Sequence, residues 1–353
     1  MLRHAKRLTA VLLATGLAVS ACGSSGDTAQ TDDGRTVVRY QGWASEVDPH
    51  ELAEDLGYFE KIKLEWVGNT ISGPQDIQSV ATGDIDVGAA FNGAVVKLHA
   101  AGAPITSVLS SYGADEGEYT GYFVLEDSPI HSARDLIGKK VGMNTLGAHH
   151  EFVVREWLAQ QGLTPEEIKQ VELTVVPPVN TEQALRAGQI DVAALQEIHR
   201  ERALERGGIR PLFTDKGLFG AFSYGTFVVR NDFLAKNREA VADFVQGTAR
   251  AIRWLQVTPR DEVVARFRDI IHKRQRNEDT KTIEFWRSSG IPVAGGVIAE
   301  RELGIWIDWL VRNGELEEGR LNAKDLYTNE FNPYANGTFP EDSGPDGQLL
   351  ANK

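Results

Sequence analysis

Two similar nine-residue segments constrain the fold of this chain more than any other feature. Residues 81–89 read ATGDIDVGA, and residues 186–194 read RAGQIDVAA. Each follows an amphipathic helical pattern, and in each a glycine suited to a helix end precedes the apolar start of a strand. Two copies predict two α/β domains that are built alike. Asp86 and Asp191 occupy the same place in the two copies, and we interpret both as turn or strand-start residues.

Short apolar strands alternate with amphipathic helices through most of the chain, which is typical of an α/β fold with helices packed on sheets. Its 353 residues are enough for two domains. We expect residues 35–127 and 225–331 to form domain 1, and residues 128–224 to form domain 2. The second part of domain 1 is expected to be mostly helical, with one helix at 279–287. Gly, Pro, Asn and Asp dominate residues 332–353, which we expect to be a poorly ordered tail.

The N-terminus has the pattern of a secretory signal peptide. A basic start and a short apolar run lead into Val-Ser-Ala-Cys22, which resembles a bacterial lipobox. We predict that residues 1–21 are removed, that Cys22 carries the lipid, and that residues 22–34 form a flexible tether. Because Cys22 is the only cysteine, the chain has no intramolecular disulfide and no cysteine-ligated metal site. The predicted location is the extracytoplasmic face of the cell membrane, with the lipid as the only anchor.

The charge of the chain excludes two classes of partner. The net charge is −13, and it becomes −16 once Arg3, Lys6 and Arg7 are removed with the signal peptide. Nucleic-acid binding needs a basic face, and so does electrostatic docking on anionic lipid. We therefore expect neither.

The stretch Gly138–Leu158 reads as a strand, a polar turn and the first turns of a helix. Asn144-Thr145 offers an N-cap, and Gly147 and Ala148 would fall in the first turn of the helix. Backbone N–H groups there lack intrahelical partners and favour negative charge. The stretch predicts either a place for a ligand or an ordinary capped helix.

Two stretches resemble a known family. Residues 72–96, SGPQDIQSVATGDIDVGAAFNGAVV, are similar to the sulfonate, nitrate and taurine group of substrate-binding proteins of ABC importers, which includes binding proteins for thiamine precursors. Residues 138–163, GKKVGMNTLGAHHEFVVREWLAQQGL, resemble the second-domain segment of the same family. The similarity extends from about Thr36 to about Leu310.

The resemblance implies a two-domain, periplasmic-binding-protein-like fold of type II, with two crossing segments and a ligand cleft between the domains. It implies a monomer that captures a small organic solute by hinge closure and delivers it to the permease subunits of an ABC transporter. We expect no cofactor, no metal and no enzymatic activity. Ligands would lie at strand ends and helix starts.

Carried over by position, the resemblance gives candidate ligand-binding residues on both sides of the cleft. From domain 1 these are Gln41, Gly42, Trp43, Phe91, Asn92, Gly93 and Tyr112. From domain 2 and the return crossing they are Thr145, Gly147, Ala148, His149, Gln196, Glu197 and Tyr224.

The candidate residues leave the ligand open. No Lys or Arg lies in residues 41–46, 89–95 or 144–150, so a sulfonate-, taurine- or nitrate-like anion would depend on backbone N–H groups, hydroxyls and one histidine. Affinity for an anion should then rise as the pH falls. Glu46, Glu197 and the acidic loop at 115–118 favour an amine instead. A zwitterion, a thiamine-precursor pyrimidine and an aromatic carboxylate therefore remain alternatives.

An enzyme on the same fold is a competing class. Relatives that synthesise the thiamine pyrimidine use a lysine–cofactor adduct, a sacrificial histidine and a cysteine-rich motif, and this chain has no cysteine beyond Cys22. It also has no G-x-S-x-G or H-E-x-x-H motif. An extracellular scaffold, a third class, predicts no internal cleft.

Overall fold

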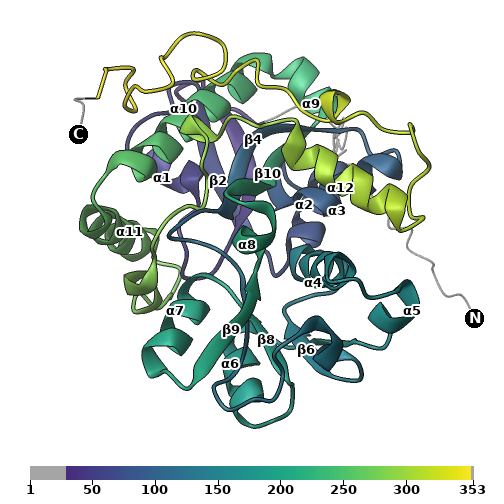
Figure 1. Cartoon of the computed structure of the whole chain (residues 1–353). Helices are drawn as coiled ribbons and strands as arrows, with labels where there is room; N and C mark the ends of the chain where they lie inside the picture. Colours follow the sequence, from purple (N-terminus) through teal and green to yellow (C-terminus); the bar gives the residue numbers. More distant parts are fainter. Residues whose placement is uncertain (1–28, 351–353) are drawn as a thin grey trace, which may run out of the picture.

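A computed structural model of the protein describes residues 29–350. The predicted signal peptide, Cys22 and most of the predicted tether lie outside these residues. The described chain forms two α/β lobes, drawn one above the other in Figure 1. None of the helices within residues 29–350 is long and apolar enough to cross a membrane.

The first lobe contains two sheets. Strands β1 (Thr36–Gly42) and β2 (Ile62–Asn69) pair in parallel. Strand β10 (Phe222–Arg230) lies antiparallel between β3 (Val87–Phe91) and β4 (Ile105–Ala114). The helices of this lobe are α1 (Pro49–Asp55), α2 (Gly73–Thr82), α3 (Asn92–Ala100), α9 (Asn231–Lys236), α10 (Arg238–Val257), α11 (Arg260–Arg274) and α12 (Arg301–Arg312), with short 3₁₀ turns at Thr282–Phe285, Ala294–Gly296 and Ala323–Asp325.

The second lobe is built on one mixed sheet of five strands, in the order β7-β6-β8-β5-β9. These strands are β5 (Gly121–Leu125), β6 (Lys140–Met143), β7 (Glu172–Val175), β8 (Val192–Leu195) and β9 (Ile209–Thr214). Its helices are α4 (His149–Gln160), α5 (Pro165–Ile168), α6 (Pro178–Arg186), α7 (Glu197–Arg206) and α8 (Asp215–Phe219), with a 3₁₀ turn at Ala133–Leu136. This architecture confirms the predicted α/β fold class.

The two similar segments occupy equivalent places in the two lobes. In the first, α2 ends at Gly83, whose φ of 85° is the left-handed conformation that glycine adopts most readily. Asp86 then accepts a hydrogen bond from the backbone N–H of Arg39 at 2.9 Å. In the second, Asp191 accepts one from the backbone N–H of Lys140, also at 2.9 Å. Both aspartates therefore lie just before a strand, in line with their interpretation as strand-start residues, and each also bonds the backbone of another strand.

Sheet pairing moves the predicted domain boundaries. Residues 121–125 were expected in domain 1, but as β5 they pair with β8 and β9 of the second lobe. Residues 222–224 were expected in domain 2, but they begin β10 of the first lobe. The crossings therefore lie at 115–120 and 220–221. The sequence predicts that strands exist, but not which sheet each one joins.

The prediction of a poorly ordered tail is wrong for residues 332–350, which pack on the first lobe. The buried Asn332 donates a hydrogen bond from its side-chain amide to the carbonyl of Gly295 at 2.9 Å. The Tyr334 hydroxyl donates to the carbonyl of Gly344, and Arg253 of α10 donates to the carbonyl of Ser343. Figure 1 shows this segment in yellow, running across the top of the molecule near α10. Although the segment is rich in Asn and Gly, it is ordered, because its backbone and side-chain polar groups form hydrogen bonds with residues distant in the sequence.

The helix predicted at 279–287 is a single 3₁₀ turn, Thr282–Phe285. The β-branched Thr282 and Ile283 lower helix propensity. The ring of Trp286 packs edge-on against Phe267 of α11, with ring centroids 5.5 Å apart. Tertiary packing therefore sets the conformation of this segment.

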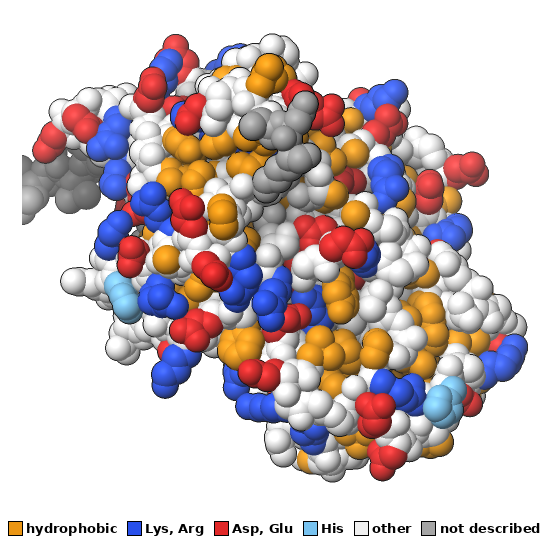
Figure 2. Space-filling model, turned by 60° about the vertical axis from the view of Figure 1, so that its left-hand side comes forward, with side chains coloured by type: hydrophobic (Ala, Val, Ile, Leu, Met, Phe, Trp, Pro, Cys, Tyr) orange, Lys and Arg blue, Asp and Glu red, His pale blue; other side chains and the backbone are white. Residues whose placement is uncertain are grey.

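Charges are interspersed over the surface. Figure 2 shows acidic and basic side chains alternating over one face, with apolar patches between them. Exposed pairs such as Lys61–Glu239 (2.9 Å) are of the kind that contributes little stability.

Candidate functional site

A cavity of about 290 Å³ lies between the two lobes. It is lined by the loop after β1, the ends of β3 and β4, the start of α4, the junction of β8 and α7, the start of β10, and the segment 283–289. Ends of strands and starts of helices therefore converge on it from both lobes, as expected for a ligand site in an α/β protein.

The first-lobe wall includes the loop between β1 and α1, which carries Trp43, Glu46 and Asp48. Arg274 of α11 holds this loop by donating to the backbone carbonyl of Glu46 at 2.7 Å. Glu278 accepts a hydrogen bond from the backbone N–H of Ser45 at 2.8 Å. Ser45 has a φ of 64°, so a residue other than glycine adopts the left-handed conformation here. The loop is thus fixed by side chains that are distant in the sequence.

Aromatic rings connect the lobes behind the cavity. The His149 ring of α4 stacks on Tyr224 of β10, with centroids 3.7 Å apart and planes 7° apart. Tyr224 in turn contacts Tyr112 of β4 edge-on, at 5.3 Å. Phe91, at the end of β3, meets His149 at 5.4 Å. Strand ends of the first lobe and the first residue of α4 therefore form one continuous wall.

Two buried histidines at the start of α4 both face fixed partners. His149 Nε2 lies 2.8 Å from Asp215 Oδ2, and His150 Nε2 lies 2.7 Å from Gln196 Oε1. Burial, together with the neighbouring His149, lowers the pKa of His150 to about 4. His150 is therefore neutral at physiological pH and supplies no positive charge for an anion.

The start of α4 differs from the prediction. Ala148 is the N-cap, Gly147 precedes the helix, and neither Asn144 nor Thr145 caps it. The backbone N–H of Gly147 donates to the Glu151 carboxylate at 2.8 Å. An acidic side chain in the first turn therefore already occupies one of the donors expected to face an anion, and it interacts favourably with the helix dipole.

The cavity is acidic. Four carboxylates line it: Glu46, Asp48, Glu118 and Glu197. Burial raises the pKa of all four, and Glu197 and Asp48 add to the effect at Glu46. Arg287 is the only Lys or Arg among the described residues of the lining, and it pairs with Glu201 at 2.8 Å.

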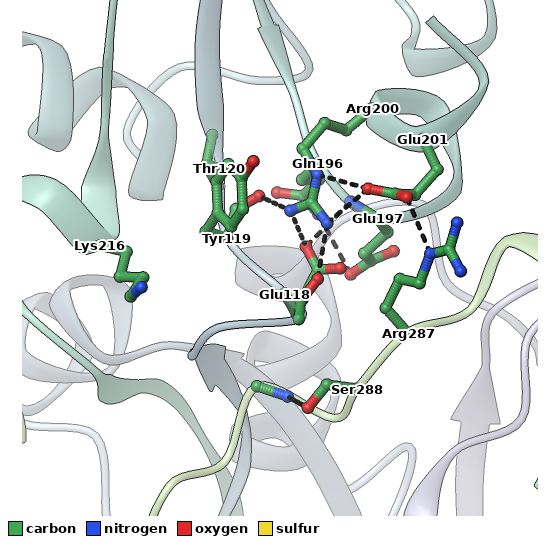
Figure 3. A network of polar contacts seen from close by, with 12 residues as sticks. Glu118, Tyr119, Thr120, Gln196, Glu197, Arg200, Glu201, Lys216, Arg287 and Ser288 are labelled. Carbon is green, nitrogen blue, oxygen red and sulfur yellow. Dashed lines mark hydrogen bonds and ion pairs between the residues drawn. The ribbon is translucent and has the colours of Figure 1, made fainter. Parts of the chain in front are cut away.

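Arg200 of α7 sits beside this acidic group, and Figure 3 shows its contacts. Its guanidinium lies 3.3 Å from Glu118 and 2.9 Å from Glu201, and it also donates to the backbone carbonyls of Gly117 and Tyr119. Only 1% of the Arg200 side chain is exposed. The arginine therefore fixes the crossing segment at 117–119 to the second lobe.

The structure brings nine of the fourteen candidate residues together in the lining of the cavity. They are Trp43, Phe91, Tyr112, Thr145, Ala148, His149, Gln196, Glu197 and Tyr224. The other five, Gln41, Gly42, Asn92, Gly93 and Gly147, are not among the lining residues. The buried Asn92 instead donates from its amide to the carbonyl of Glu302 at 2.9 Å. Contact of the nine with a ligand stays a prediction.

Several lining residues were absent from the sequence-based candidates. The most informative are Glu46, Asp48, Ser111, Glu118, His150 and Trp286. Glu118 carried a signal, since it belongs to the acidic loop that favours an amine. Trp286 carried none, because its segment was expected to be helical and nothing local places it at the cavity.

The described part of the chain offers no obvious metal site. Residues 29–350 contain no group of three or more His, Cys, Asp or Glu side chains arranged to hold a metal ion.

Comparisons with known proteins agree with the geometry. The family model described as NMT1/THI5 like matches residues 46–262. An aliphatic sulfonates-binding protein of Escherichia coli (strain K12) is 29% identical over 200 residues, covering 56% of this chain and 57% of that protein. The 4-amino-5-hydroxymethyl-2-methylpyrimidine phosphate synthase of Candida albicans (strain WO-1) is 28% identical over 227 residues, covering 60% of this chain and 64% of that enzyme.

A solved structure supports the fold over a longer range. The periplasmic nitrate-binding protein NrtA of Synechocystis PCC 6803 superposes with a TM-score of 0.66 at 14% identity, covering 88% of this chain and 92% of that one. The family match spans more than half of the chain and confirms the resemblance of residues 72–96 and 138–163. The chain therefore belongs to the NMT1/THI5-like family and has the two-lobed fold of periplasmic binding proteins.

Proposed function

We propose that the protein is the extracytoplasmic solute-binding component of an ABC importer, and that it captures a small organic solute by closure of its two lobes. The observation that carries this proposal is the cavity of about 290 Å³ between two lobes that the chain connects through the crossings at 115–120 and 220–221. Each lobe supplies part of the lining, so a ligand would favour the closed arrangement through contacts with both.

The names of the relatives give a first class of ligand. They support a sulfonate- or nitrate-like solute, and the resemblance of the sequence adds taurine to this class. The similarity to the pyrimidine phosphate synthase, together with the aromatic rings of Trp43, Tyr112 and Trp286 in the lining, supports a flat heterocycle as the second candidate. An aromatic carboxylate fits the same rings but would meet four carboxylates.

Binding without turnover is proposed over catalysis. One relative is an enzyme, so the family includes both activities. In this chain the cavity lining, as far as the structure describes it, contains no lysine and no cysteine. The ring of His149 is held by the buried Asp215, and the ring of His150 by the partly buried Gln196. These features favour a rigid binding pocket over a site that supplies a reactive side chain.

The partners and the location belong to the same proposal. A lipid on Cys22 would tether the monomer to the membrane, and the two lobes would deliver the solute to the permease. Loss of membrane association in the Cys22→Ala variant, measured by fractionation, would test the anchor.

Small-angle X-ray scattering combined with thermal shift tests the carrier role. The probes are ethanesulfonate, nitrate, benzoate and 4-amino-5-hydroxymethyl-2-methylpyrimidine. We expect at least one to raise the melting temperature and reduce the radius of gyration, and to be recovered chemically unchanged. A ligand at a hundred times its Kd stabilises a protein by about 2.7 kcal/mol, so the shift is measurable. Consumption of the probe would instead indicate an enzyme.

A further inference from the structure

Two carboxylates from opposite lobes line the cavity without a cationic partner. Among the described residues, the carboxylate of Glu46 in the first lobe has no hydrogen bond and no ion pair. The carboxylate of Glu197 in the second lobe accepts one weak hydrogen bond, at 3.4 Å, from the amide of Gln196. A carboxylate that is ionised away from water is unfavourable unless a positive charge pairs with it. Glu46 and Glu197 would therefore each be stabilised by a cation in the cavity.

The nearby arginines are engaged in ion pairs with other carboxylates, and none forms one with Glu46 or Glu197; Arg274 and Arg200 act on these two only as more distant charges. Arg200 binds Glu118 and Glu201, and Arg287 binds Glu201. Arg274 binds Glu51 at 2.7 Å and Glu278 at 2.5 Å, and it reaches Glu46 only through the backbone carbonyl. The arginines around the cavity therefore position its walls and leave Glu46 and Glu197 without a direct cationic partner.

Residues in the left-handed backbone conformation lie at or next to both carboxylates. Glu197 has a φ of 50°, and its N–H donates to Glu118 at 2.9 Å. Glu46 follows Ser45, whose φ is 64°. Residues other than glycine rarely adopt this conformation, and where they do the surrounding structure enforces it. Figure 3 shows the Glu197 side chain next to that of Glu118, at the start of α7.

The rest of the lining suits a small, flat solute with a polar end. Trp43, Tyr112 and Trp286 line the cavity, and the faces of such rings attract cations as well as flat groups. Ser111 also lines it, and its hydroxyl has no hydrogen-bond partner although only 6% of the residue is exposed. A buried hydroxyl without a partner at the cavity points to a group that the ligand provides.

We propose that the solute carries a protonated nitrogen, as an ammonium or amidinium group on a small flat skeleton, and that this nitrogen binds between Glu46 and Glu197. The proposal rests on the proposed function, since it names the class of solute that the carrier takes. A cation between the two carboxylates pairs one charge from each lobe, so the same contact that gives specificity also stabilises the closed form. A zwitterion satisfies the proposal through its amine end, whereas a simple anion does not.

Matched pairs of compounds test the charge directly. The pairs are benzylamine with benzyl alcohol, benzamidine with benzamide, and 2-aminoethanesulfonate with ethanesulfonate, measured by thermal shift and calorimetric titration at pH 7.5. We expect at least one protonated member to bind ten times more tightly than its partner that lacks the charged nitrogen. Scattering should show that this member also reduces the radius of gyration.

Variants connect the effect to the two carboxylates. Glu46→Gln and Glu197→Gln should each weaken binding of the protonated member at least tenfold, and Glu46→Asp should retain part of the affinity. Glu172→Gln, which changes an exposed carboxylate of β7, is the control and should leave affinity unchanged. Circular dichroism identifies any variant that fails to fold. The affinities of the folded variants then show whether the two carboxylates bind the protonated nitrogen.

The possible outcomes separate the two proposals. Binding and closure with only the uncharged or anionic members would overturn the proposed charge of the solute and leave the carrier role standing. Unchanged affinity for the protonated member in both Gln variants would also overturn it. Failure of every compound, including those used to test the carrier role, to bind or to close the lobes would count against both proposals.

Discussion

Two pairs of acidic residues, one member in each lobe, behave differently in this protein. Asp86 and Asp191 directly precede equivalent strands, and each accepts a hydrogen bond from the backbone of a neighbouring strand. Glu46 and Glu197 line the cavity, and neither carboxylate has a cationic partner among the described residues. The aspartates are therefore paired within the folded protein, whereas the two cavity glutamates are not.

The difference shows how to tell a structural carboxylate from one available to a ligand. Asp86 combines burial with full pairing, since Arg39 approaches both of its oxygens, at 2.8 and 3.0 Å. Glu46 combines partial burial with no ion pair and has only the more distant Arg274 charge to stabilise it, so a cation that enters the cavity would be its first direct partner. Partners, more than burial, distinguish the two kinds of residue.

The largest expected effect on stability comes from removing Asp86, which pairs with Arg39 in the first lobe. Asp86→Ala should lower the free energy of unfolding by about 3 kcal/mol, because the Asp86 side chain is only 1% exposed and its partners lose their acceptor. Asp191→Ala should lower it by about 1 kcal/mol, because that side chain is 35% exposed and its ion pair with Lys139 is long, at 3.7 Å. Urea denaturation measures both. Equal losses would mean that the two aspartates do not differ as their burial predicts.

Replacing a cavity carboxylate should change stability in the opposite direction. Glu46→Gln and Glu197→Gln should each raise the free energy of unfolding of the ligand-free protein at pH 7.5, by roughly 1 kcal/mol. Burial raises the folded-state pKa of both groups, so the wild type loses stability as the pH rises from the unfolded pKa through the folded one. Glutamine has no charge and avoids this loss. The gain should therefore shrink as the pH falls toward 4.5, and urea denaturation over this pH range checks it.

A gain that persists unchanged at pH 4.5 would contradict this explanation. It would indicate that glutamine is stabilising through new hydrogen bonds and not through the removal of charge. Glu239→Gln, an exposed carboxylate paired with Lys61, is the control and should change stability by less than about 0.5 kcal/mol at either pH.

Ion pairs between the lobes should have smaller effects. Glu201 of α7 pairs with Arg287 of the first lobe at 2.8 Å, and Glu156 of α4 pairs with Arg312 of α12 at 3.0 Å. Arg287→Gln should favour the open form by roughly 0.5 kcal/mol, a change of about twofold in the equilibrium, because the pair is partly exposed. Fluorescence energy transfer between labels on the two lobes measures it. Arg312→Gln provides the comparison on the other side, and no change in either variant would show that neither pair sets the closure.

The smallest expected effect is that of replacing His150 on the pH dependence of ligand affinity. Its pKa of about 4 means that it stays neutral between pH 6 and 8. His150→Gln should therefore leave the pH dependence of ethanesulfonate affinity in this range unchanged within a factor of two. The sequence predicts a rise in anion affinity as the pH falls, and burial of His150 moves any contribution from this histidine below the physiological range. A clear loss of pH dependence in the variant, measured by calorimetry, would show that His150 is charged in the complex.

Much of the fold and part of the candidate site follow from local patterns. The glycine before Asp86 ends a helix, and the apolar residues after it form a buried strand, as the sequence predicts. Trp43, Tyr112 and Glu197 follow or end predicted strands, and all three line the cavity. These positions are predictable because strand ends and helix starts are encoded within a few residues.

Other features depend on contacts between distant residues. The loop with Glu46 is held by Arg274, and the crossing at 117–119 is held by Arg200. Trp286 reaches the cavity because its ring packs on Phe267. No local pattern distinguishes these side chains from others on the surface.

By itself, the sequence determined two α/β halves, the structural role of Asp86 and Asp191, and a family whose members bind ligands between such halves. Only the tertiary structure decided that residues 332–350 are ordered, that Glu151 occupies the start of α4, and that the cavity is acidic. The physical reason is that helices and strands follow from neighbouring residues, whereas the pairing of a charge depends on which distant groups folding brings within a few ångströms.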